Sequence, residues 1–170
     1  MKPLLLLLML LPFMTPANAA GQPDNMPPQT IVKEQRCPVC GMFPARYPKW
    51  RTQVIFKDKE MTASDSPADL FRFLQDLPRY DKKHVPADIA SIYVTDFESG
   101  KWVDAKLAYF VDGSSAKGPM NMPDLPAFAN RDRAEAFSGK KGGKVLGFDQ
   151  VTPEVIKGLQ QDHGHHDHKH

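Results

Sequence analysis

Both cysteines of the chain lie in one short segment, Cys37-Pro-Val-Cys40-Gly-Met42, which also carries a methionine. Two thiols at this spacing are common in disulfide-exchange centres, in zinc sites and in sites for softer metals. Each kind of site needs different neighbours, so the rest of the sequence has to discriminate among them.

The Cys-x-x-Cys pair alone allows a structural disulfide, a thiol–disulfide oxidoreductase centre or half of a zinc site. An exported protein favours disulfides, although a Cys37–Cys40 bond would close a very small loop and stabilise the fold little. A redox pair belongs to a β-α-β context, whereas Pro38 and Pro44 prevent a regular helix here. A structural zinc site requires four ligands, and outside the C-terminal tail the sequence adds only one histidine, His84. These three interpretations remain alternatives.

Met42 adds a thioether to the pair of thiols. In an extended or turn segment, side chains two residues apart project to the same side, which lets Cys40 and Met42 face a common point. Thiolate and thioether ligands select Cu(I) over harder ions. The segment therefore favours a soft-metal site with Cu(I) as its ion.

A second pair of sulfur atoms lies far along the chain, in the loop segment Gly118-Pro-Met120-Asn-Met122-Pro. The two methionines have the same spacing as Cys40 and Met42. We expect this loop to converge on the cysteine segment and complete the site. The candidate metal ligands are Cys37, Cys40, Met42, Met120 and Met122.

The remaining polar residues do not indicate catalysis. No Ser/His/Asp set, phosphate-binding loop or telling pair of carboxylates is evident. The aspartates at 65, 69, 96 and 104 are interpreted as helix caps, turns or solvated strand positions. The sequence therefore predicts a binding protein that is not an enzyme.

The elements that must position these sulfur atoms follow from hydrophobic periodicity. Residues 50–63 alternate around a polar turn and predict a hairpin. Residues 64–77 predict a helix that Ser64 or Ser66 caps and Pro78 ends. Further strands are expected at 89–97, 101–111, 127–130 and 144–148, with helices at 131–141 and 152–160. This order predicts an α+β fold with a largely antiparallel sheet and packed helices, and it fits two loosely related β-β-α modules.

The chain is expected to divide into four parts. Residues 1–19 read as a secretory signal peptide, with an apolar run too short to span a membrane. Residues 20–30 are a flexible lead-in, 31–160 the metal-binding domain, and 161–170 a disordered histidine-rich tail. We expect a soluble periplasmic protein after cleavage, without stable membrane insertion. The formal net charge of +2 is too small to indicate a nucleic-acid partner.

Three blocks of sequence resemble the NosL family of nitrous-oxide reductase accessory proteins. They are "CPVCGMF", the later "GPM", and "AEAFSGKKGGKVLGFDQVTPE", and the resemblance runs from about Arg36 to Ile156. The resemblance implies a mixed α/β periplasmic chaperone for Cu(I). Its implied partners are nitrous-oxide reductase, for which it supplies the copper-sulfide centre, or a related exported copper enzyme, and an ABC-type maturation transporter complex.

The same resemblance assigns the copper thiolate to Cys40 and a thioether to Met120, with Met42 as a third ligand. The chain departs from the family pattern at three points. It has no lipid-bearing cysteine near the cleavage point, it has the additional thiol of Cys37, and it carries the histidine-rich tail. Cys37 is therefore either a further copper ligand or a disulfide partner. The alternative functions are a periplasmic thiol–disulfide oxidoreductase and a zinc-binding interaction module.

Overall fold

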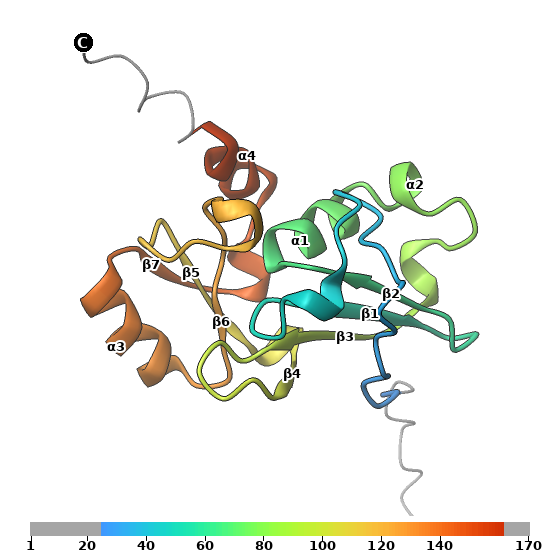
Figure 1. Cartoon of the computed structure of the whole chain (residues 1–170), viewed down its shortest axis with the longest axis horizontal. Helices are drawn as coiled ribbons and strands as arrows, with labels where there is room; N and C mark the ends of the chain where they lie inside the picture. Colours follow the sequence, from blue (N-terminus) through green and yellow to red (C-terminus); the bar gives the residue numbers. More distant parts are fainter. Residues whose placement is uncertain (1–24, 162–170) are drawn as a thin grey trace, which may run out of the picture.

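The fold is built on two antiparallel sheets (Figure 1). The computed structural model describes residues 25–161. The first sheet has the order β2-β1-β3-β4 and the second the order β6-β5-β7. The strands are β1 (Thr52–Phe56), β2 (Met61–Ser64), β3 (Ile89–Thr95), β4 (Trp102–Asp104), β5 (Tyr109–Asp112), β6 (Ala127–Phe128) and β7 (Lys144–Gly147). Every ladder within the sheets is antiparallel.

Helices pack against these sheets, which confirms the predicted α+β class. The α-helices are α1 (Pro67–Gln75), α2 (Leu77–Tyr80), α3 (Arg131–Lys141) and α4 (Pro153–Gln161). Helix α1 contacts β1, β2 and α4, whereas α3 contacts the strands of the second sheet. The order β-β-α occurs in both halves, as β1-β2-α1 and as β5-β6-α3.

Helix α1 begins where its sequence signal indicates. Ser66 is the N-cap, and its hydroxyl accepts a hydrogen bond from the Asp69 amide at 3.3 Å. The predicted end is wrong, because the helix stops at Gln75 and Pro78 lies inside α2. Asp76 leaves the helical region with φ −139°. Leu77 then starts a new helix, in whose first turn a proline needs no amide hydrogen bond.

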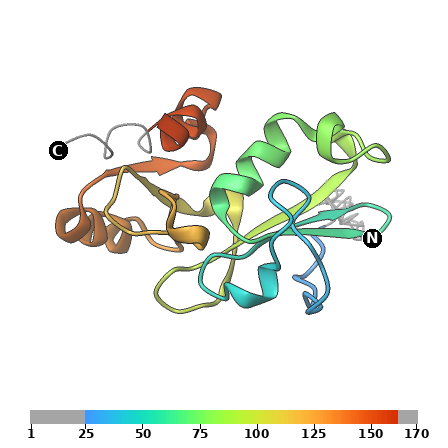
Figure 2. The same ribbon diagram turned by 45° about the horizontal axis from the view of Figure 1, so that its top comes forward.

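The larger of two hydrophobic clusters runs through both halves of the molecule. Its members come from the first sheet, α1, β5 and α4. The largest fully buried side chains include Phe56, Leu70, Phe73, Phe110 and Leu125. Burying each such side chain contributes about 1.5–3 kcal/mol. Because the core is shared, the halves are packed as one body (Figure 2).

Asp96 joins the two sheets at the end of β3. Its carboxylate accepts a hydrogen bond from the Ala129 amide at 2.8 Å, and the Phe97 amide donates to the Ala127 carbonyl at 2.8 Å. The same carboxylate accepts from the amide and the hydroxyl of Ser99. The expected turn role of Asp96 is therefore combined with a contact between the sheets.

The folded part of the described chain includes residues that precede Ile31. Residues 25–30, expected within the flexible lead-in, lie against the first sheet. The Met26 amide donates to the Ser91 hydroxyl at 2.8 Å, and the Gln29 amide donates to Gln53 Oε1 at 2.9 Å. The expected signal peptide and residues 162–170 of the tail lie outside the described residues. Among the described residues, no helix has the length and apolar character to cross a membrane.

Candidate metal centre

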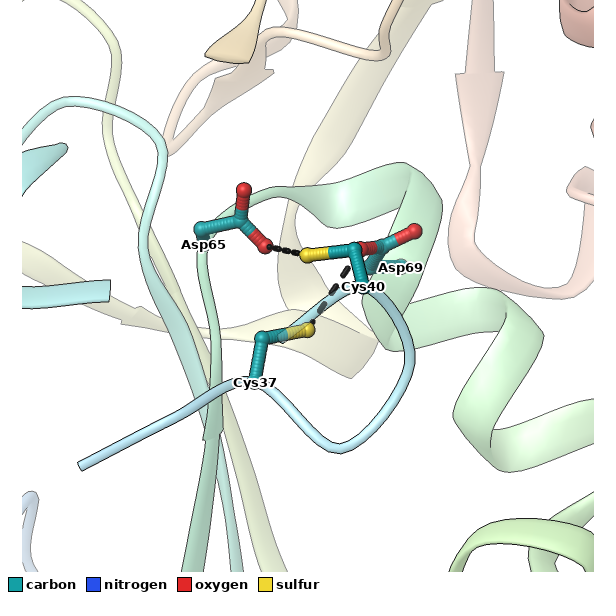
Figure 3. Close-up of side chains that lie close together, drawn as sticks. All are labelled: Cys37, Cys40, Asp65 and Asp69. Carbon is teal, nitrogen blue, oxygen red and sulfur yellow. Dashed lines mark hydrogen bonds between the residues drawn. The ribbon is translucent and has the colours of Figure 1, made fainter. Parts of the chain in front are cut away.

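The cysteine segment folds into a tight turn in which Cys37 is buried and Cys40 is exposed. The Gly41 amide donates to the Cys37 carbonyl at 2.9 Å, and the Cys37 amide donates to the Met42 carbonyl at 2.8 Å. Gly41 has φ +78°, which glycine adopts without steric cost. Figure 3 shows both sulfur atoms facing the carboxylates of Asp65 and Asp69. The short spacing thus serves to place two thiols beside each other.

Two aspartates from the start of α1 complete this cluster. The Cys40 thiol lies 3.0 Å from Asp65 Oδ1, and the Cys37 thiol lies 3.4 Å from Asp69 Oδ2 (Figure 3). One donor atom from each of the four residues lies within 4.8 Å of all the others. We call Cys37, Cys40, Asp65 and Asp69 the thiol–carboxylate cluster.

The aspartates were missed because the sequence offers them another role. Asp65 and Asp69 flank the cap of α1, where acidic residues are favoured by the helix dipole. Both are almost fully buried, at 2% and 5% exposure, which a solvated cap does not require. Their four-residue spacing across a helix start was the available signal. The partner thiols, some thirty residues earlier in the chain, become visible only in the folded protein.

Cys40 and Asp65 each hold a proton more tightly than the free side chain does. The pKa of the Cys40 thiol is raised far above its usual range by its hydrogen bond with Cys37, by burial and by Asp65. The pKa of Asp65 is also raised, chiefly by burial. A redox-active cysteine needs a lowered pKa to supply a thiolate. The shift in the pKa of Cys40 is in the opposite direction.

A pocket of about 330 Å³ opens beside Cys40. Met120 and Met122 line it together with Cys40, so the two predicted loops do converge on one space. Asp65, Asp69 and Asp124 contribute oxygen atoms to its wall, and Leu159 of α4 closes another side. The pocket thus combines soft sulfur donors with acidic oxygens.

The other two predicted ligands are placed differently. Cys37 is buried behind Cys40 and does not line the pocket. Met42 also lies outside the pocket lining, and it contributes its carbonyl oxygen to the turn. The positive φ of Gly41 breaks the extended geometry on which the same-side argument for Met42 depended.

The methionine loop is a strained turn held against α1. Met120 and Asn121 both have left-handed backbones, with φ +60° and +59°, a conformation that costs non-glycine residues about 1–2 kcal/mol. The Gly118 amide donates to the Met122 carbonyl at 2.8 Å and closes the turn. Met120 is 63% exposed and Met122 37% exposed. The loop therefore presents thioethers at the mouth of the pocket.

Asp124 ties this loop to the start of α1. Its carboxylate accepts from the Ala68 amide at 3.0 Å and from the Leu125 amide at 2.8 Å. A Cβ at Gly118 would lie 2.7 Å from the Asp124 Cβ, so only glycine fits there. Burial raises the pKa of Asp124 to about 6. The loop, the helix and the thiol–carboxylate cluster thus meet at one point.

A second group of metal-binding residue types surrounds His84, which the sequence had left without partners. Its Nδ1 lies 2.7 Å from Asp81 Oδ2, and its Nε2 lies 3.1 Å from Asp58 Oδ2. The Lys83 ammonium also pairs with Asp58 and with Glu60. We call Asp58, Glu60, Asp81, Lys83 and His84 the histidine cluster.

Comparison with known proteins identifies the fold and the sequence pattern. Residues 28–156 match the profile of the NosL family. The chain belongs to the NosL family. Relatives named "Copper-binding lipoprotein NosL" come from Stutzerimonas stutzeri and Achromobacter cycloclastes. The first is 29% identical over 85% of this chain and 77% of the relative, and the second 29% identical over 79% and 69%.

A solved NosL structure has the same architecture. The crystal structure of the copper chaperone NosL from Shewanella denitrificans superposes with a TM-score of 0.64. It is 29% identical and covers 75% of this chain and 97% of its own. These relatives are named as copper-binding proteins or as a copper chaperone.

Proposed function

We propose that this NosL-family chain binds Cu(I) and delivers it to an exported copper enzyme. The observation that carries the proposal is the shared pocket of Cys40, Met120 and Met122. These residues lie eighty positions apart in sequence, and each supplies a soft sulfur donor of the kind that selects Cu(I). We call Cys40, Met120 and Met122 the sulfur set.

Copper binding replaces the thiol proton of Cys40. In the metal-free chain that proton is donated toward Asp65 Oδ1. Cu(I) takes its place, the proton passes to solvent, and the thiolate anchors the ion while the thioethers complete its coordination. Thioethers are neutral donors, so they hold the ion less strongly than thiolates. Ligand exchange with an acceptor thiol or thioether then moves the ion without any bond-making chemistry.

The exposure of the methionine loop supports transfer. Met120 projects at the mouth of the pocket with 63% of its surface exposed. An acceptor protein can therefore approach the ion from the Met120 side while Cys40 still holds it. The strained backbone of Met120 and Asn121 reduces the cost of moving this loop, because a shift to ordinary angles releases strain.

The proposed setting is the periplasm. The predicted signal peptide and the lipoprotein relatives both support export. The proposed client is nitrous-oxide reductase, for whose copper-sulfide centre the chain supplies copper beside an ABC-type maturation transporter complex. A related exported copper enzyme is the alternative client.

Anaerobic titration of the reduced chain with Cu(I) against a competing chelator tests binding. We expect one high-affinity Cu(I) per chain. Cys40→Ser should lower the affinity more than 100-fold, since losing a ligand exceeds the about 10–100-fold cost of losing a partner behind a ligand. Met120→Leu and Met122→Leu should each weaken binding, whereas Met61→Leu, a methionine outside the pocket lining, should not. Unchanged binding in Cys40→Ser would refute the proposal.

Two further variants address the ligands that the pocket does not include. Cys37→Ser and Met42→Leu test whether these predicted donors reach the ion after loading.

The client is tested in a denitrifying host that lacks its own NosL protein. Nitrous-oxide reductase should then lack its copper-sulfide centre, and the wild-type chain should restore it while Cys40→Ser should not.

A further inference from the structure

The segment that carries the cysteine turn also concentrates positive charge. Residues 33–51 contain five lysines and arginines and a single acid, Glu34, so their formal net charge is +4. The whole chain has a net charge of only +2, and the rest of the sequence is therefore net negative. A charge distribution of this kind attracts an oppositely charged partner to one part of the surface.

Two of these cations are held on one aromatic ring. The Arg36 guanidinium carbon lies 4.3 Å from the centre of the Phe43 ring, and the Arg46 guanidinium carbon lies 4.8 Å from it. A cation over the face of a ring is attracted to it, so both side chains have a fixed place although both residues are exposed. We call Arg36, Phe43 and Arg46 the arginine stack.

No carboxylate of the described chain compensates the arginine stack. Three other arginines form ion pairs with acidic side chains, but neither Arg36 nor Arg46 has such a partner among residues 25–161. Two guanidiniums beside one ring repel each other, and a guanidinium presents its N–H donors in a planar fork that matches a carboxylate. Carboxylates from another molecule would therefore complete the arrangement.

The arginine stack lies beside the proposed copper pocket. Arg36 Nη1 donates to the Gly41 carbonyl at 3.0 Å, which ties this side chain to the cysteine turn directly after Cys40. Cys40 is exposed and lines the pocket. Met120, on the other loop of the pocket, is exposed as well. A protein bound at the stack is therefore held next to the atoms from which copper would leave.

We propose that the arginine stack docks an acidic surface of the protein that receives Cu(I). This inference rests on the proposed function, because it names the chemistry of the acceptor's contact surface. Carboxylates of the acceptor bind the two guanidiniums, and the charge of residues 33–51 steers the acceptor toward the cysteine turn. Because Phe43 already holds both arginines, docking costs little side-chain entropy.

The observations favour a protein over an anionic membrane as the partner. Segments that bind anionic lipid carry clusters of about 4–8 cations or an apolar face that enters the membrane. The stack has two guanidiniums, and its ring is partly buried and covered by them. Its place beside an exposed thiol also suits a protein, because a protein can supply the groups that take over the copper ion.

The association rate with purified, copper-free nitrous-oxide reductase tests the inference. The rate for the Cu(I)-loaded wild-type chain should fall at least about tenfold between about 0.01 M and about 1 M salt, because salt screens the attraction between opposite charges. Arg36→Gln combined with Arg46→Gln should lower the rate at low salt by a similar factor and remove most of its salt dependence. Its Cu(I) affinity, measured against a competing chelator, should stay unchanged.

A denitrifying host that lacks its own NosL protein provides the second measurement. The double glutamine variant should restore less of the copper-sulfide centre than the wild-type chain does at equal protein level. Lys140→Gln combined with Lys144→Gln is the matched control, because it removes two exposed cations from α3 and β7, and it should behave as wild type. Arg36→Lys with Arg46→Lys keeps both charges and should retain the salt-dependent association, with faster dissociation because the planar fork is lost.

Full association and full assembly in the double glutamine variant overturn the inference, and so does an association rate that does not fall with salt. If that variant loses binding to vesicles of phosphatidylglycerol and phosphatidylcholine but assembles the centre normally, the stack serves a membrane, and the inference is again overturned.

Two further outcomes keep the test decisive. If Arg36→Gln disturbs the cysteine turn and lowers Cu(I) affinity, Arg46→Gln alone decides, since among residues 25–161 the Arg46 side chain has no hydrogen bond to that turn. Unchanged association in that single variant contradicts the inference. A wild-type chain that binds no Cu(I) overturns the proposed function, whereas the association rate of the metal-free chain still tests the docking surface.

Discussion

The thiol–carboxylate cluster and the histidine cluster contain similar residue types but are balanced differently. In the histidine cluster, Lys83 pairs with Asp58 and Glu60, and His84 lies between Asp58 and Asp81. Both ring nitrogens of His84 face carboxylate oxygens, and these hydrogen bonds raise the pKa of the ring despite its burial. The ring also stacks on Phe56 at 3.8 Å. Every acid in this group therefore faces a cation from the chain itself.

The thiol–carboxylate cluster lacks this internal compensation. Arg72 pairs with Asp69, while Asp65 relies on the Cys40 thiol. The cluster also borders the pocket, whose lining includes the Cys40 thiol and the Met120 and Met122 thioethers. The difference teaches that a histidine among acids does not by itself make a metal site. A buried carboxylate that no cationic side chain pairs with, beside thiols that can lose a proton, is a stronger indication of a metal site.

Asp124→Asn has the largest expected effect, on the pH dependence of stability. The folded pKa of Asp124 is about 6, above the ordinary 3.8. The folded state therefore binds the proton more tightly, and protonation as pH falls from about 6 to about 4 stabilises the fold. The shift of about two units corresponds to about 3 kcal/mol. The variant should lose this gain, measured as the free energy of unfolding in urea at pH 7.5 and pH 4.

Because the pKa of Asp65 is also raised, part of the pH dependence of stability should remain in Asp124→Asn. Asp149→Asn serves as the control and should keep the wild-type slope. If the free energy of unfolding depends on pH equally in wild type and in Asp124→Asn, burial does not raise the pKa of this carboxylate as described.

His84→Gln should destabilise the fold by about 2 kcal/mol at pH 6, through the loss of charge-assisted hydrogen bonds. Burial lowers the pKa of His84, but the hydrogen bonds to Asp81 and Asp58 outweigh it and leave the pKa above 6.5. The stabilisation is thus complete below pH 6.5 and is lost as pH rises through the folded pKa. Urea midpoints at pH 6 and pH 9 measure it.

The difference between wild type and His84→Gln should therefore shrink at pH 9. A difference that grows with pH would show that His84 is neutral and that the cluster is not compensated as described. The window of His84 lies above that of Asp124, so the two regions can be separated in one pH series.

Gly118→Ala should have a smaller effect on stability, about 1 kcal/mol, at the lower end of the cost of overpacking. The added Cβ would lie 2.7 Å from Asp124 Cβ and would push the methionine loop away from α1. Cu(I) affinity should fall with it. Gly139→Ala is the matched control, since nothing lies within 4 Å of its Cβ. Equal Cu(I) affinity in both variants would mean that the position of the methionine loop does not determine Cu(I) binding.

Lys83→Met should have the smallest effect. Its ion pairs with Asp58 and Glu60 are exposed, and exposed pairs contribute little. We expect a melting temperature between those of wild type and His84→Gln, and an unchanged Cu(I) affinity. A loss larger than that of His84→Gln would indicate that the lysine, and not the histidine, holds this cluster together.

Most of the fold could be predicted from the sequence because local signals and burial agreed. The hairpin of β1 and β2, the Ser66 cap and the Asn130 cap of α3 all stand where periodicity and capping residues indicate. The predicted end of α1 was wrong because a proline such as Pro78 can either end a helix or stand in the first turn of the next one. The lead-in was placed too long because the hydrogen bonds of Met26 and Gln29 join residues far apart in sequence.

The candidate site was predicted only in its soft donors. Sulfur is rare enough for Cys40, Met120 and Met122 to stand out, and the structure brings them to one pocket. The placement of Met42 depended on an extended backbone that Gly41 does not adopt. Asp65 and Asp69 resemble ordinary acidic residues at a helix start. Their contacts with the two thiols join residues far apart in the chain, and no local sequence pattern records such contacts.

The pocket also draws its donors from both sides of the joint at Asp96. Cys40 belongs to the N-terminal side of that joint, and Met120 and Met122 belong to the C-terminal side. Neither the N-terminal nor the C-terminal half alone, in a nascent or a cleaved chain, therefore contains all three donors of the sulfur set. Binding of a soft ion by the full sulfur set therefore requires that both halves have folded together. An incompletely folded chain would bind a reactive metal ion weakly.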